Sequence, residues 1–196
     1  MIPRHLQIAF GLMVAVLVAL GFYAMHLKRR ADAIQALQAD MRPVPPPVSG
    51  QAGQLKLFVA YDDEGILRQR DVSTTIPSEP SQRARQALRA LLAVYVEQPS
   101  PHPIGSGADV KDVYILADNS AVIDMNLAFA ETHRSGVFVE QMTIVSMLQT
   151  LSTAAPQITR AHILVEGKQR ETLAGHADLS GFYDMALINQ LARELQ

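Results

Sequence analysis

The stretch that decides the fold of this chain is residues 87–126, which begins with ALRALLA, passes through a connector rich in Pro and Gly, and ends in VYILADNSAVIDMN. Its partner is residues 140–167, which begins with EQMTIVSMLQTL and ends in HILVEG. The apolar spacing changes from helical to alternating and back along these two stretches. A helix, two paired strands, a second helix and a last strand in this order predict one small α+β module.

The two strands at the end of the first stretch form a predicted hairpin. Residues 111–117 and 121–126 flank Asp118 and Asn119, residue types that tolerate the positive φ of a tight turn. Alternation places one set of side chains on the face that we expect to be buried. That set is Val113, Ile115, Ala121, Ile123 and Met125.

Each of the two predicted helices has an apolar stripe at helical spacing. The first begins near Glu79, with Pro80 in its first turn. Its stripe consists of Ala84, Ala87, Leu88, Leu91, Leu92 and Tyr95. The second helix ends before Pro156, and its predicted buried stripe consists of Phe138, Ile144, Val145, Leu148 and Leu151.

The remaining segments complete the module. Residues 54–61 and 66–73 read as the arms of a hairpin, and residues 158–166 as the last strand. Residues 129–136 read as a polar excursion, and residues 171–179 as extended. A terminal helix is predicted over 183–195, with Met185, Leu187, Ile188, Leu191 and Leu195 as its apolar residues.

Composition excludes several classes of protein. The net charge of -2 and the pI near 6.3 do not favour a nucleic-acid partner, because such proteins usually carry a basic face. Cys is absent, which excludes disulfides, thiolate metal sites and an acylated cysteine anchor. The hydrophobic fraction of 48% is high, and much of the excess lies in the first 27 residues.

Residues 6–27 are predicted to form a transmembrane helix. The run is long enough to cross the hydrocarbon core, which takes about 20 residues, and Lys28, Arg29 and Arg30 follow it directly. The alternative is a cleaved secretory signal, but residues 21–24 match its cleavage site poorly. The residues expected to anchor the chain in the membrane are Leu6, Ile8, Phe10, Leu12, Val16, Leu20, Phe22 and Tyr23.

A spacer separates this anchor from the α+β module. It combines a stretch of helix formers with RPVPPPV at residues 42–48, where proline prevents a helix. The predicted division is an anchor with its flanks at 1–30, a helical and Pro-rich linker at 31–53, the domain at 54–184 and a C-terminal helix at 185–196.

Taken together, these segments resemble the GerMN domain family, which is named from a sporulation and spore-germination protein. The resemblance covers about residues 55–184 and depends on the order of several motifs. These are ALRALL at 87–92, PIGSG at 103–107, AVIDMNLAF at 121–129, LQTL at 148–151, ILVEGK at 163–168 and ETLAGHADL at 171–179.

The resemblance implies an α+β fold in which two helices pack on a small mixed or antiparallel sheet, similar to the ring-building modules of envelope channel proteins. It also implies a bacterial envelope protein without known catalysis, with its domain outside the cytoplasmic membrane. The count of Lys28, Arg29 and Arg30 opposes that orientation. We follow the family here, and expect a single-pass inner-membrane protein with a periplasmic domain. The single copy and the absence of Cys are departures that leave ring assembly out of this expectation. A sporulation role is not carried over, because the domain also occurs in organisms that make no spores.

The search for chemistry identifies few candidates. His176 and Asp178 are two residues apart and could bind a ligand, but a third metal ligand is missing, and a structural hydrogen bond is the other interpretation. Ser146 lacks the glycines of a nucleophile elbow. We therefore expect no catalytic residues, no metal and no cofactor.

Two hypotheses about function follow. The first is a non-enzymatic, membrane-anchored module that binds an envelope protein or another copy of itself. The alternative is a domain that binds a cell-wall fragment or glycan through residues 98–107 together with His176 and Asp178.

Overall fold

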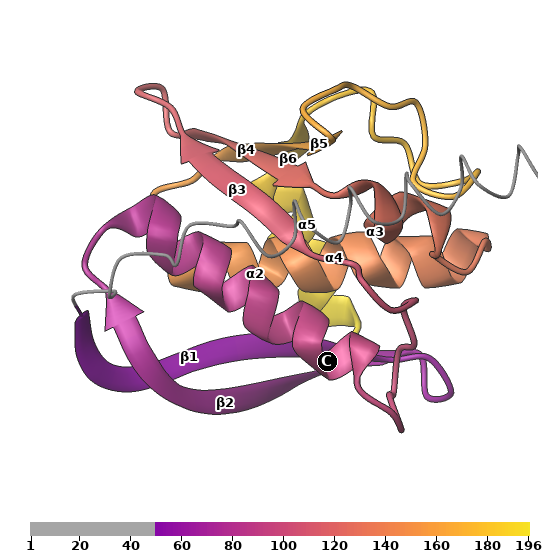
Figure 1. The fold of residues 1–196 in the computed structure, drawn as a ribbon, viewed down its shortest axis with the longest axis horizontal. Helices are drawn as coiled ribbons and strands as arrows, with labels where there is room; N and C mark the ends of the chain where they lie inside the picture. The colour runs from indigo at the N-terminus through magenta and orange to yellow at the C-terminus, as the bar shows by residue number, and fades with distance from the viewer. Residues whose placement is uncertain (1–49) are drawn as a thin grey trace, which may run out of the picture. The chain divides into compact units, whose positions relative to one another are not determined.

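Helices α2 (Pro80–Val96) and α4 (Val137–Ala154) form the middle of three layers (Figure 1). The computed structural model describes residues 50–196, which belong to one compact unit. The other elements, in chain order, are β1 (Gly50–Tyr61), β2 (Ile66–Pro77), β3 (Val110–Ile115), β4 (Ser120–Met125), α3 (Leu127–Glu131), β5 (Arg160–Val165), β6 (Tyr183–Asp184) and α5 (Met185–Glu194). The predicted α+β class is confirmed.

The predicted membrane helix falls at residues 6–27, outside the described residues. Within 50–196, every helix is too short or too polar to cross a bilayer.

The two outer layers are separate sheets, and this corrects the expectation of one small sheet. Strands β1 and β2 pair only with each other among the described strands, whereas the second sheet has the order β3-β4-β5-β6. In that sheet β4 and β5 run parallel, and the other neighbours are antiparallel. Helix α4 is buried around most of its circumference. A single sheet covers only one side of a helix, so the second sheet covers the other side (Figure 1).

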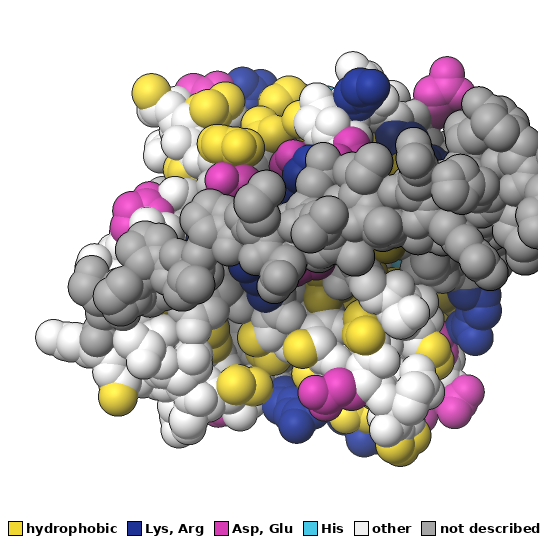
Figure 2. Space-filling model, in the orientation of Figure 1, with side chains coloured by type: hydrophobic (Ala, Val, Ile, Leu, Met, Phe, Trp, Pro, Cys, Tyr) yellow, Lys and Arg dark blue, Asp and Glu magenta, His cyan; other side chains and the backbone are white. Residues whose placement is uncertain are grey.

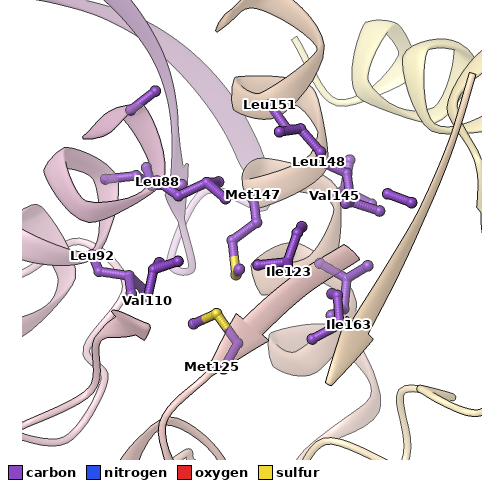
Figure 3. Close-up of a cluster of buried hydrophobic side chains, with 14 of the residues drawn as sticks. Leu88, Leu92, Val110, Ile123, Met125, Val145, Met147, Leu148, Leu151 and Ile163 are labelled. Carbon is purple, nitrogen blue, oxygen red and sulfur yellow. The ribbon is translucent and has the colours of Figure 1, made fainter. Parts of the chain in front are cut away.

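The predicted hairpin at Asp118 and Asn119 is confirmed. Val113 pairs with Ile123, and Asn119 adopts a φ of 59° in the turn. The alternation also holds, since Ala121, Ile123 and Met125 are all fully buried. These side chains meet those of α2 and α4 in the main core, where Figure 3 shows Met147 of α4 beside Ile123.

The stripe predicted for the first helix is confirmed in full, but the stripe of the second is wrong in part. The ring of Phe138 is 46% exposed, because Phe138 lies in the first turn of α4, where the β1–β2 turn at Gly65 gives only partial cover. The pattern also missed four polar residues of this helix that are fully buried. They are Glu140, Thr143, Ser146 and Thr150.

Two segments predicted to be irregular or extended differ in the structure. Residues 129–136 are not a polar excursion, because Asn126 caps the short helix α3, with its side chain accepting from the Phe129 N–H, and Phe129 is fully buried. Residues 171–179 form a compact loop closed by one bridge between Thr172 and Asp178, which buries Leu173 and Leu179. The terminal helix forms as α5, although Leu187 on it is 56% exposed.

Tyr95 of α2 joins the helix layer to the β1–β2 sheet through its hydroxyl group. The hydroxyl accepts from the Ala60 N–H on β1 at 2.9 Å and donates to Ser146 Oγ on α4 at 2.9 Å. Burial raises the pKa of Tyr95 well above its usual value, so the group stays a neutral donor.

Replacing Tyr95 with Phe is predicted to lower the free energy of unfolding by about 1–3 kcal/mol, because the buried Ala60 N–H loses its acceptor. Urea unfolding of the full chain in detergent micelles measures this change. Tyr114→Phe is the matched control, since its ring is 52% exposed, and it should change the free energy of unfolding by less than about 0.5 kcal/mol. Equal losses in the two variants would contradict the prediction.

Candidate functional site

A buried polar cluster lies beside Tyr95, where four segments of the chain meet. Asp62 comes from the β1–β2 turn, His102 from the loop before β3, His133 from the turn after α3, and Thr143 from α4. The Nδ1 atom of His102 lies 2.5 Å from Asp62 Oδ1, and its Nε2 atom lies 2.6 Å from Thr143 Oγ1. His133 Nε2 approaches the same hydroxyl at 2.7 Å. We call these four residues the Asp–His–Thr–His cluster.

Three members of this cluster follow the order of a nucleophilic triad, with a carboxylate, an imidazole and a hydroxyl in line. Both His102 and Thr143 are nevertheless fully buried, and the Thr143 hydroxyl also contacts the Val139 carbonyl at 3.1 Å. Burial, the largest effect, lowers the pKa of both His102 and His133. The Thr143 hydroxyl is therefore enclosed in the protein interior.

Glu140 forms a second buried site at the start of α4. Its Oε2 atom accepts from the backbone N–H groups of Ala174, His176 and Ala177 at 2.8–3.0 Å. Its Oε1 atom accepts from the Gly136 N–H at 3.1 Å and lies 2.9 Å from His176 Nδ1. Burial alone raises the pKa of Glu140, but these donors outweigh it and lower the value to about 2.

The two ligand candidates from the sequence have different surroundings. His176 uses Nδ1 to bind Glu140, and so holds the C-terminal loop to α4. Asp178 is exposed, and its carboxylate accepts from the N–H and hydroxyl of Ser180. Both residues line a groove of about 310 Å³ between α4 and α5, whose walls include Ile144 and Leu191. No residue of the 98–107 loop lines this groove, so the structure does not bring together the parts of the predicted glycan site.

Within residues 50–196, no three His, Asp or Glu side chains are grouped closely enough to hold a metal ion. Ser146, which lies mid-helix, is engaged by Tyr95.

An aromatic row crosses the outer face of the four-stranded sheet. Tyr114 pairs with Val122, and Val122 pairs with His162 in the next strand. The His162 ring packs edge-on against Phe182 at 4.9 Å, and the Arg160 guanidinium lies 4.8 Å from the centre of the Phe182 ring. Tyr114 and Phe182 are each about half exposed. Figure 2 shows hydrophobic side chains gathered at the β3–β4 side of the molecule, among charged residues.

Sequence reasoning missed the row and the cluster for different reasons. The row was detectable, because Tyr114, Val122 and His162 occupy the strand positions that alternate with the core. The partners in the Asp–His–Thr–His cluster are 10 to 41 residues apart along the chain, and no local pattern connects them.

Replacing Glu140 with Gln is predicted to destabilise the domain by about 2–4 kcal/mol at pH 7, because the new amide group would face N–H donors. The pH dependence gives a second readout. The folded-state pKa lies below the usual 4.5, so this stabilisation is present above about pH 4.5 and is lost as the pH falls toward 2.

Urea unfolding at pH 7 and at several acid pH values measures both effects. Glu171→Gln, at an exposed position of the same loop, is the control and should leave the pH profile unchanged. An E140Q profile that fell in acid as steeply as the original protein would show that Glu140 is not the titrating group.

Comparisons with known proteins agree with this description. The family model described as sporulation and spore germination, named Germane, matches residues 56–171, which is more than half of the 196 residues. Among curated proteins, no match is found.

Solved structures give a similar result. The tandem GerMN domains of the sporulation protein GerM from Bacillus subtilis match with a TM-score of 0.52 at 18% identity, over 68% of this chain and 46% of that one. A putative lipoprotein from Clostridium perfringens matches with a TM-score of 0.46 at 17% identity, over 73% of this chain and 93% of that one. This chain thus spans about half the length of the tandem-domain structure, whose likeness shows the fold alone. The resemblance to the GerMN domain is confirmed, and the chain belongs to the Germane family of sporulation and spore germination domains.

Proposed function

We propose that this chain is a non-catalytic protein-interaction module of the bacterial cell envelope, and that it binds its partner through the outer face of the four-stranded sheet. The observation that carries this proposal is the aromatic row from Tyr114 to Phe182.

The composition of that face supports a protein partner. A sheet with one face on the core usually presents polar side chains on the other. Here Tyr114, Leu116 and Phe182 are each exposed by about half on that side of the structure. Grouped apolar and aromatic side chains rimmed by charge are typical of protein-binding surfaces, where Tyr and Arg contribute strongly. Arg160 and Asp118, which pair at 2.7 Å, supply charge at the edge of the row.

The interior supports a non-catalytic role. The triad-like part of the Asp–His–Thr–His cluster is closed to solvent, and Glu140 is saturated by donors from the chain itself. The groove between α4 and α5 has mainly apolar walls, and of its polar residues His176 is held by Glu140 and Asp178 accepts from Ser180.

Attachment to the membrane is part of the same proposal. The apolar run at 6–27 is long enough to span a bilayer, and the spacer at 31–53 would hold the domain away from its surface. We place the domain on the periplasmic side, against the charge count of Lys28, Arg29 and Arg30, because long domains translocate despite flanking charge. The partner is another envelope protein or a second copy of this chain, and nucleic acid is not expected.

Site-specific photocrosslinking in cells tests the contact surface. A photoreactive amino acid at position 114 or 182 of the full chain should give a discrete crosslinked protein product, because both side chains lie on the proposed face. The same amino acid at exposed position 70 on β2, in the other sheet, is the matched control and should not.

Two differently tagged copies in one cell identify the partner. A product that carries both tags is a second copy, and a product with one tag is a different protein. Products of equal yield at position 70, or none at 114 and 182, would refute this surface.

A reporter enzyme that is active only outside the cytoplasm, fused after Gln196, tests the orientation. We expect activity from the full chain and none from a variant that lacks residues 6–27, because the deletion removes the only long apolar run in the sequence. An inactive fusion to the full chain would place the domain in the cytoplasm.

A further inference from the structure

We propose that the Asp–His–Thr–His cluster carries one proton more than it would have with Asp62 ionised and both imidazoles neutral. This extra proton makes the cluster a pH-sensitive lock between α4 and the loops around it. The proposal follows from counting hydrogens and is independent of the proposed function.

When Asp62 is ionised, the Nδ1 atoms of both histidines must carry hydrogen. His102 Nδ1 lies 2.5 Å from a carboxylate oxygen of Asp62, and His133 Nδ1 lies 2.8 Å from the Arg134 carbonyl oxygen. Ionised carboxylates and carbonyl groups can only accept a hydrogen bond. In a neutral imidazole only one nitrogen is protonated, so each Nε2 would then be a bare acceptor.

Both Nε2 atoms face the same hydroxyl group. Thr143 Oγ1 lies 2.6 Å from His102 Nε2 and 2.7 Å from His133 Nε2. A threonine hydroxyl has a single hydrogen, for which the Val139 carbonyl oxygen at 3.1 Å also competes, so it can donate to at most one of the two nitrogens. With both imidazoles neutral, the other nitrogen would hold its lone pair against the hydroxyl oxygen, a repulsive contact in a site where neither His102 nor Thr143 reaches water.

One additional proton removes this conflict. One imidazole becomes a cation and donates from Nε2 to Thr143 Oγ1, and the Thr143 hydroxyl donates to the other imidazole. Placing the proton on Asp62 instead gives the same count, because a protonated carboxyl can donate to Nδ1 and leave Nε2 of His102 as the donor to Thr143. The nearby negative charge of Asp62 compensates the extra positive charge.

Charges on the surrounding elements limit the cluster to a single extra proton. Asp62 favours protonation of His102, whereas Arg134, which lies 2.6 Å from Asp62, opposes it. Glu140 on α4 favours a charge on His133, and His102 and Arg134 oppose one. The other rings that pack on the two imidazoles, those of Tyr95 and Phe129, are neutral. Burial, the largest effect, lowers the pKa of both imidazoles, and this opposes a second proton in the cluster.

Loss of this proton would weaken contacts among four segments at once. The cluster ties the β1–β2 turn, the loop that carries His102 and the turn that carries His133 to one residue of α4. As the pH rises through the pKa of the first proton, one imidazole must leave Thr143, and the loop that carries it loosens. The lock therefore closes in acid and neutral conditions and opens in alkali.

Long-range proton–nitrogen NMR of the histidine rings tests the proposal on the full chain in detergent micelles, between pH 5 and pH 10. Histidine-to-asparagine variants at 102 and 133 assign the signals. At pH 7 we expect the chemical shifts to show the extra proton, either on one of the two imidazole rings or in the His102–Asp62 pair. The shifts should then change in a single step as the pH rises and this proton leaves.

Two variants at position 143 separate this role from a merely structural one. Thr143→Ser keeps the shared hydroxyl and should retain the extra proton. Thr143→Val removes it, and the proton should then leave at a lower pH, because the shared hydroxyl no longer opposes burial, the largest effect that lowers the pKa of both imidazoles. Two neutral rings beside an ionised Asp62 at pH 7 in the unmodified chain would overturn the proposal, whether or not the valine variant folds.

Discussion

The enclosure of helix α4 between two sheets is the constraint on which the rest of the structure depends. The helix faces β1 on one side and the strands of the larger sheet on the other, with α2 and α5 beside it (Figure 1). Nearly every side chain from Glu140 to Leu151 must therefore find its partner inside the protein. Apolar residues do so by packing, as Val145, Met147 and Leu148 do in the main core (Figure 3). Its polar residues need specific acceptors and donors, because an unpaired polar group would be costly there.

Those polar residues form a stripe along α4, and each member holds a different part of the chain. Glu140, Thr143, Ser146 and Thr150 are three or four positions apart, which places them on one side of the helix. Glu140 binds the C-terminal loop, and Thr143 binds the two histidines. Ser146 accepts from Tyr95, and the Thr150 hydroxyl accepts from the Phe58 N–H of β1 at 2.9 Å. Segments with little regular structure thus obtain a defined position from one buried helix.

This use of the interior bears on function. Groups that could catalyse a reaction on an open surface, such as the imidazole of His102 and the hydroxyl of Thr143, are committed to holding loops in place. Side chains available to a partner lie instead on the outer face of the larger sheet, where Tyr114 and Phe182 project beside Arg160. This outer face is where we place the recognition of a protein partner.

The sequence by itself determined the elements whose signals are local. The stripe of α2, the hairpin turn at Asn119 and the burial of alternate residues in β4 follow from spacing and turn chemistry over a few residues, and all of them are present in the structure. Only the tertiary structure decided that the strands form two sheets, that Phe138 is exposed and that four polar residues of α4 are buried. It also decided that His102 and His133 share one hydroxyl, and that Glu140 meets the loop at 174–177. The physical reason is that burial and pairing depend on what lies on the other side of an element, and those neighbours come from distant parts of the chain.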